Sequence, residues 1–201
     1  MLEGVGLESS GLVAWCDESM RKVEGEPTYY LLASIERSYD EGAIALLEAA
    51  KPSGAKKLHW RDLGLDAQAR SLHVIAGMDL QQFCVSARPM NMRKQERARR
   101  KCLELLLPLL EAAGVGMLVL ESRNDAQNKM DRELVMSARR KHLITRIDLS
   151  HQPGGGQPML WVPDQVVGAL GAVESSGIAP SEWSADWRRI ERDLIVYTVT
   201  P

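Results

Sequence analysis

Apolar residues follow two patterns along the chain: short continuous runs, and stripes with helical spacing. The run at 11–16 ends at the adjacent acids Asp17 and Glu18, as expected of a strand that is buried on both faces and ends at a functional edge. Similar runs predict further strands at 29–35, 82–87, 115–120, 143–149 and 194–199. The charged segment 20–27, which contains Gly and Pro, predicts a hairpin connection between the first two strands.

Apolar residues three and four positions apart predict the helices. These are expected from a Ser38–Glu41 capping box to Pro52, from Asp66 to Gly77, from Arg93 to Ala113, from Asn124 to Lys141, from Pro163 to Val173, and around Trp183 and Trp187. The resulting order, β-β-α-α-β-α-β-α-β-α followed by α-β, predicts an α/β fold with a mixed five-stranded sheet flanked by helices. We expect a core at about 11–174 and a C-terminal α-β appendage at about 178–201.

Composition is typical of one globular domain, which we place at 1–201. The chain is 45% hydrophobic and 26% charged, and no apolar window of about eighteen residues predicts a membrane span. Residues 1–4 do not resemble a signal peptide. The three cysteines lie far apart without a Cys-x-x-Cys pair, which indicates reduced core residues. We therefore expect a cytoplasmic protein with no membrane partner.

The net charge of −2 conceals a basic cluster around the start of the helix at 93–113. A basic helix face is often only solvated, but it is also suited to nucleic-acid phosphates. The cluster includes Arg99, and the residues we expect to bind nucleic acid are Arg93, Lys94, Arg97, Arg100, Lys101 and, outside the cluster, Arg61.

Acidic residues recur where predicted strands end or helices begin. Asp17 and Glu18 close the first run, Glu121 closes the run at 115–120, and Asp164 follows Pro163 in the first turn of a late helix. Ligands of open α/β sheets gather beyond the carboxyl ends of strands. Each acid also has an ordinary explanation, as turn or helix-start chemistry, but together they predict a cluster that needs a cation.

Several segments of the chain resemble the domain of unknown function 3800 family, a group of ribonuclease H-like proteins. The matching pieces are Asp17-Glu18-Ser19 after an apolar run, the segment 58–63, Glu121 at a strand end, and 160–169 at a helix start; together they span most of 12–174. The chain departs from the family pattern at Met20, where Gly is usual, at Trp161, where Gln is usual, and at Glu121, which stands for a shorter Asp.

The resemblance implies a ribonuclease H-like fold and a Mg²⁺- or Mn²⁺-dependent nuclease or phosphoryl-transfer enzyme acting on DNA or RNA. A pair of such ions activates a water and stabilises the leaving oxygen, and Mg²⁺ prefers carboxylates and water as ligands. Asp17, Glu121 and Asp164 are the expected metal ligands and catalytic residues, and Glu18 is a further metal ligand. His59 is expected to act as an acid, a base or a phosphate contact.

Two other functions stay open. A catalytically silent ribonuclease H-like module that binds nucleic acid or a protein partner is favoured by the departures at Glu121 and Trp161. A thiol hydrolase built on Cys16 is a more distant alternative, because a thiolate inside an apolar strand is costly. The last strand, 194–199, is expected at a sheet edge or at a homodimer contact.

Overall fold

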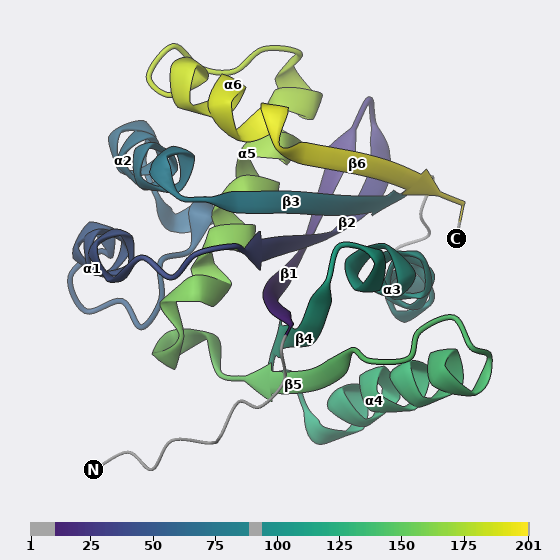
Figure 1. Ribbon diagram of the computed structural model, residues 1–201. Coiled ribbons are helices and arrows are strands. Elements are labelled where there is room, and N and C mark those ends of the chain that lie inside the picture. The colour runs from purple at the N-terminus through teal and green to yellow at the C-terminus, as the bar shows by residue number, and fades with distance from the viewer. Residues whose placement is uncertain (1–10, 89–93, 201) are drawn as a thin grey trace.

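A mixed six-stranded sheet forms the centre of the protein. The structure, a computed structural model, describes residues 11–88 and 94–200. Within these residues the strand order is β5-β4-β1-β2-β3-β6 (Figure 1). The strands are β1 (Leu12–Val23), β2 (Glu26–Glu36), β3 (Leu80–Ala87), β4 (Val115–Glu121), β5 (Asp148–Gln152) and β6 (Leu194–Val199). β2 is antiparallel to β1 and β3, whereas the pairs β1–β4, β4–β5 and β3–β6 are parallel.

Helices cover both faces of this sheet. They are α1 (Glu41–Ala50), η1 (Trp60–Asp62), α2 (Leu65–Gly77), α3 (Gln95–Ala112), α4 (Asp125–Arg140), η3 (Gly154–Gly156), η4 (Pro158–Leu160), α5 (Trp161–Ser176) and α6 (Ser184–Arg192). One apolar core lies between the sheet and α3 with α4, and a second lies between the sheet and α1, α2, α5 and α6. Figure 1 shows α3 and α4 apart from the other helices. The predicted α/β class is confirmed.

The sheet has six strands, so the prediction of five strands is wrong. β6 of the predicted C-terminal appendage pairs with β3 along its whole length, and α6 packs on α2 and contributes Trp187 and Ile190 to the second core. An apolar strand next to an open sheet edge completes that edge because its backbone groups need partners.

The first hairpin is longer than predicted. β1 and β2 remain paired from Val13↔Glu36 to Val23↔Glu26, so most of the segment expected as a connection is strand. Glu24 and Gly25 form the turn with positive φ angles of 52° and 84°. This conformation suits two-residue hairpin turns, and Gly25 adopts it without steric cost. The hairpin therefore extends well past Asp17.

Two local predictions also need correction. The N-cap of α1 is Asp40, whose side chain accepts a hydrogen bond from the backbone N–H of Ala43, in place of the expected Ser38 box. Asp is as good an N-cap as Ser, and Asp40 directly precedes the helix. β5 begins at Asp148, because the backbone N–H groups of Thr145 and Arg146 donate to the Glu111 carboxylate instead of to a strand.

No helix within residues 11–88 and 94–200 combines the length and the apolar character that a membrane-spanning helix needs.

Candidate functional site

Asp17 and Glu121 lie side by side on neighbouring parallel strands. The last pair between β1 and β4 is Cys16↔Leu120, so the next residue of each strand is an acid. Side chains alternate between the two faces along a strand. The residues two places earlier, Trp15 and Val119, both belong to the core on the α5 side. Asp17 and Glu121 therefore project from the face that α5 covers.

Asp164 reaches the same place from the first turn of α5. Pro163 precedes it at a position where a missing N–H costs no hydrogen bond, and the helix dipole favours a carboxylate there. Oδ1 of Asp164 lies 2.9 Å from Nδ1 of His59, and Oδ2 accepts a 2.7 Å hydrogen bond from the backbone N–H of Trp60. Nε2 of Gln165 donates to the same Oδ2 at 3.2 Å. These contacts fix a buried carboxylate and tie α5 to η1.

Glu121 is held by a cation. Nζ of Lys57 donates to Oε1 of Glu121 at 3.0 Å and to Oε2 at 2.8 Å. A Cβ at Gly154 would lie 2.5 Å from Oε1, so a glycine in η3 leaves room for this carboxylate. The loop before η1 and the loop after β5 thus both contact the end of β4.

The pKa of Asp17 is raised by burial and by its acidic neighbours. Burial raises the pKa of Asp17 well above its ordinary value, and the charges of Asp164 and Glu121 raise it further. The backbone N–H of Glu18, which donates to Oδ1 at 2.8 Å, and the charge of Lys57 act in the opposite direction. The negative charges of Asp164 and Glu121 therefore both act on Asp17, and the charge of Lys57 offsets part of that repulsion.

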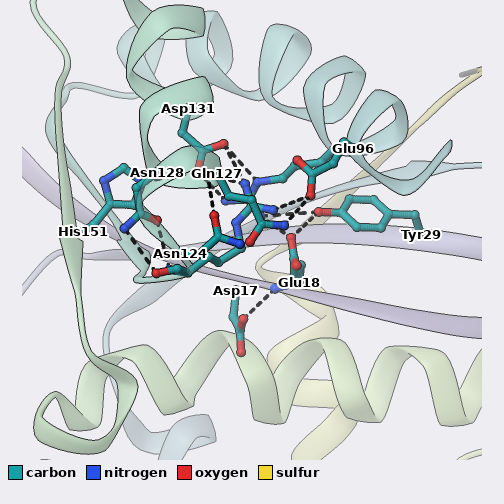
Figure 2. A network of polar contacts seen from close by, with 11 residues as sticks. Asp17, Glu18, Tyr29, Glu96, Asn124, Gln127, Asn128, Asp131 and His151 are labelled. Carbon is teal, nitrogen blue, oxygen red and sulfur yellow. Dashed lines mark hydrogen bonds and ion pairs between the residues drawn. The ribbon is translucent and has the colours of Figure 1, made fainter. Parts of the chain in front are cut away.

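Glu18 points away from Asp17, to the opposite face of β1 (Figure 2). Its Oε2 accepts hydrogen bonds from the Tyr29 hydroxyl and from Nη1 of Arg99. Arg99 also donates to both carboxylate oxygens of Asp131, at 3.1 Å from Nε and 2.9 Å from Nη2. The Arg99 side chain is only 5% exposed. Glu18 therefore belongs to a buried network on the α3 side, and lies across the strand from the other three acids.

The network continues through α4 and β5. Oδ2 of Asp131 lies 3.2 Å from Nε2 of His151, and Nη2 of Arg123 donates to Oδ1 at 3.2 Å. Nη1 of Arg123 pairs with Glu96 at 2.6 Å. Burial by itself would raise the pKa of Asp131, but the hydrogen bonds and charge of Arg99, with Arg123 and His151, hold it below its ordinary value. The network joins β1, β2, α3, α4 and β5 behind the acid cluster.

The sequence pattern does not predict this network, and the prediction that Arg99 belongs to a solvated basic cluster is wrong. Arg99 lies four and seven residues before Leu103 and Leu106, so it falls on the apolar stripe of α3 and is buried with it. A charge on the apolar face of a helix needs a buried partner of opposite sign. That position was the available indication, and Asp131 could not be identified as the partner without the fold.

The other predicted phosphate-binding residues are exposed. Lys94 is the N-cap of α3, Arg97, Arg100 and Lys101 lie in its first turns, and Arg61 lies in η1. Arg100 and Lys101 both form ion pairs with Glu104. Nε of Arg61 lies 3.8 Å from Oδ1 of Asp62. Arg93 lies outside the described residues.

The acid cluster has the ligand types of a metal site but not the arrangement of one. Among residues 11–88 and 94–200, no three His, Cys, Asp or Glu side chains are arranged so that they could share one ion. The donor types still suit Mg²⁺, which binds a few carboxylates and keeps several waters. Both carboxylate oxygens of Glu121 accept hydrogen bonds from Lys57, and both oxygens of Asp164 contact His59 or Trp60. An ion bound to Glu121 would therefore have to displace the Lys57 ammonium group.

Two cavities flank the cluster. One, of about 160 Å³, is lined by Asp17, Glu18 and Glu121 together with Arg99 and Arg123. The other, of about 350 Å³, lies beside Asp164 and His59. A small ligand or one segment of a polymer could therefore approach the acids from either side.

The cysteines are buried and unpaired with one another. Burial raises the pKa of Cys16 well above its ordinary value, so a thiolate is disfavoured there. This observation counts against the thiol-hydrolase alternative.

Comparison with models of known protein families gives no match, and comparison with curated proteins gives no relative.

Proposed function

We propose that this protein is a divalent-metal-dependent phosphodiesterase that acts on DNA or RNA. Three carboxylates from distant parts of the chain, Asp17, Glu121 and Asp164, converge on one face of the sheet and are close enough to raise the pKa of Asp17. Clustered acids that repel one another are stabilised by a cation, and perturbed carboxyl groups are frequent at catalytic sites.

The topology supports a ribonuclease H-like assignment. Three antiparallel strands, β1 to β3, are followed by β4 and β5, which lie parallel to β1 on its other side and are reached through helices. This is the arrangement implied by the resemblance to the domain of unknown function 3800 family. Glu121 ends β4 as expected, whereas Asp17 lies in the middle of β1, at the point where its pairing with β4 ends, and not at the carboxyl end of the strand.

Mg²⁺ or Mn²⁺ is the proposed cofactor. Asp17, Glu121 and Asp164 would hold it only after the side chains rearrange and the Lys57 ammonium group leaves Glu121, because no three acidic side chains of the described residues are now placed to share one ion. Such an ion supplies a more acidic bound water and charge stabilisation at the leaving oxygen. Lys57 neutralises Glu121 when no ion is bound. Asp17 offers Oδ2 to a ligand, since only its Oδ1 accepts a hydrogen bond from the described residues.

His59 is the residue proposed to move a proton. Hydrolysis forms a bond between the water oxygen and phosphorus and breaks the bond to the leaving oxygen, which takes up a proton. Nδ1 of His59 faces Asp164, and the ring lines the larger cavity. An imidazole oriented by a carboxylate through one nitrogen can exchange a proton through the other.

The exposed basic residues would bind the phosphate backbone without reading sequence. Those proposed are Arg61, Lys94, Arg97, Arg100 and Lys101. This contact predicts affinity that falls steeply with salt concentration.

The test is cleavage of single- and double-stranded DNA and RNA with Mg²⁺, with Mn²⁺ and with a chelator. Asp17→Asn and Asp164→Asn should each lose at least about 100-fold in rate, which corresponds to about 2.7 kcal/mol of transition-state stabilisation. Asp66→Asn, an exposed acid in the first turn of α2, is the matched control and should keep full activity. Cleavage that survives both cluster variants contradicts the proposal.

The Lys57–Glu121 ion pair favours a second candidate, a catalytically silent module that binds nucleic acid or a protein. An ammonium group already satisfies Glu121, so the cluster needs no ion for stability. This candidate predicts no cleavage of any substrate, no Mg²⁺ binding, and oligonucleotide binding that Asp17→Asn leaves unchanged.

A homodimer through β6 is proposed as well. Within the described residues β6 pairs only with β3, and Ile195 and Val196 are each 40% exposed on an uncharged edge strand. Such edges pair with other chains unless they are protected. Light scattering should show a dimer for the wild type and a monomer for Val196→Lys; a monomeric wild type contradicts this part of the proposal.

A further inference from the structure

A cavity of about 350 Å³ opens beside Asp164, and its lining combines charged and polar side chains with the apolar surface of Met20 and Trp60. Arg21 of β1 and Arg61 of η1 line it, together with His59, and Asp164 and Gly168 form its α5 side. Glu18 also borders it, but the Glu18 carboxylate is bound by Arg99 and Tyr29. The cavity is thus continuous with the acid cluster and carries positive charge beyond it.

Arg21 lies directly against α5 at Gly171, where any larger residue would require the Arg21 side chain to move. A Cβ at Gly171 would lie 2.2 Å from Cδ of Arg21 and 2.6 Å from its Nε. Nε of Arg21 is buried and has no hydrogen-bond partner among the described residues. Burial lowers the pKa of Arg21, and the negative charge of Asp164 acts in the opposite direction. A buried donor of a cationic group without a partner is costly and favours an anionic ligand.

Three residues of α5 form a row from the acid cluster to Arg21, and the first two of them line the cavity. Asp164, Gly168 and Gly171 recur at helical spacing and lie on one face of α5. A Cβ at Gly168 would lie 2.2 Å from Cγ of Trp60, so the indole fills the space above the middle residue. The path from Asp164 to Gly171 measures about 10 Å along the helix axis. Arg21 therefore lies about two helical turns along α5 from Asp164 of the candidate reaction site.

We propose that Arg21, with Arg61 at the rim, binds a backbone phosphate of the nucleic-acid strand, next to the phosphodiester held at the acid cluster. This inference rests on the proposed function and names a contact that positions its substrate. A guanidinium group matches the geometry of a phosphate through paired hydrogen bonds. Trp60 is only 4% exposed, so its ring offers no face for base stacking, and phosphate recognition is favoured over base recognition.

The test measures binding separately from cleavage. Short fluorescent DNA and RNA strands are titrated with the full chain in a chelator, at several salt concentrations, by fluorescence anisotropy. Arg21→Gln should weaken binding by about 10-fold and lower the salt slope by about one, because one phosphate contact is lost. Arg37→Gln is the matched control: Arg37 follows β2 at the opposite end of the β1–β2 hairpin from its turn and pairs with Asp79, and its loss should leave both quantities unchanged.

Two further variants separate the guanidinium from the fold. Gly171→Ala keeps Arg21 but fills the space beneath it, so it should weaken binding like Arg21→Gln. Arg21→Lys keeps the charge and loses the paired donors, so it should recover only part of the affinity. The urea midpoint of each variant shows that it is folded.

The outcomes distinguish this inference from the proposed function. Binding by the wild type that is unchanged in Arg21→Gln and Gly171→Ala overturns the inference and leaves the nuclease proposal intact. Binding that depends on Arg21, in a protein that cleaves nothing, supports the inference and contradicts the nuclease proposal. If inorganic phosphate binds through Arg21 but no oligonucleotide does, nucleic acid is the wrong ligand and the inference fails.

Discussion

The ammonium group of Lys57 lies 2.8 Å from Oε2 of Glu121, although the two residues are 64 positions apart. The ammonium group lies on the α5 side of the sheet. Burial lowers the pKa of Lys57, but Glu121, Asp17 and Asp164 raise it, so the net pKa is above its ordinary value. The positive charge of Lys57 therefore offsets the negative charge of all three carboxylates. This cation explains how the acid cluster is stable without a metal ion.

Lys57→Met should therefore make the fold depend on divalent ions. Without Mg²⁺ the variant should lose about 1 kcal/mol of stability, because a partly buried carboxylate loses its partner. With Mg²⁺ the variant should regain that stability, and its melting temperature should rise more than that of the wild type. Lys129→Met, which removes an exposed ion pair with Glu133, is the control. Equal responses of both proteins to Mg²⁺ argue against an ion at this site.

Asp17→Asn should stabilise the protein in a chelator while it removes the proposed activity. The folded-state pKa of Asp17 is raised by burial, Asp164 and Glu121, so folding favours the protonated form. The wild type consequently loses stability as the pH rises from about 4, the ordinary Asp value, through the raised pKa. The amide does not titrate, so the variant's advantage should grow over that window. Urea unfolding of both proteins from pH 4 to 8 measures it, and a constant difference contradicts the assignment.

Arg99→Lys should be strongly destabilising. Lysine cannot bridge Glu18 and Asp131 with paired donors, and it leaves buried carboxylates incompletely satisfied. Removing one partner of a buried ion pair costs about 3–5 kcal/mol, and because lysine keeps the positive charge, that range is the upper bound for Arg99→Lys. Arg100→Lys, at the neighbouring exposed position, should change stability by less than about 0.5 kcal/mol. Chemical denaturation of the two variants gives the comparison, and similar stabilities would show that the network contributes little.

The apolar runs identified most strands because buried central strands leave a clear pattern in sequence. β4 coincides with the run that ends at Glu121, and β1 contains the run that ends at Asp17 and continues to Val23. β5 was misplaced for the opposite reason. It is an edge strand with the sequence Asp-Leu-Ser-His-Gln, and its His151 belongs to the buried polar network, so it has little apolar pattern.

The acids of the candidate site could be named from sequence, but their electrostatic partners could not. Asp17 and Glu121 end apolar runs and Asp164 stands at a helix start, which are local features of the sequence. Lys57 lies in an irregular loop before η1, and only the tertiary structure brings it to Glu121. Glu18 shows the same limit, because strand alternation separates it from Asp17 although the two are adjacent in sequence.

Gly168→Ala should destabilise the protein and displace the segment that carries His59. The new Cβ would lie 2.2 Å from Cγ and 2.4 Å from Cδ1 of Trp60, and a buried indole ring cannot move aside as a flexible chain can. Overpacking of this kind costs about 1–3 kcal/mol, which exceeds the gain of about 1 kcal/mol in helix propensity.

Gly77→Ala is the matched control for that change. Gly77 ends α2, and a Cβ there meets nothing within 4 Å, so the alanine should leave stability equal or raise it. Because the Trp60 N–H donates to Asp164, Gly168→Ala should also lower any cleavage rate, whereas Gly77→Ala should not. Thermal melts and cleavage assays of the pair decide this: equal behaviour would mean that the contact between η1 and α5 does not position the site.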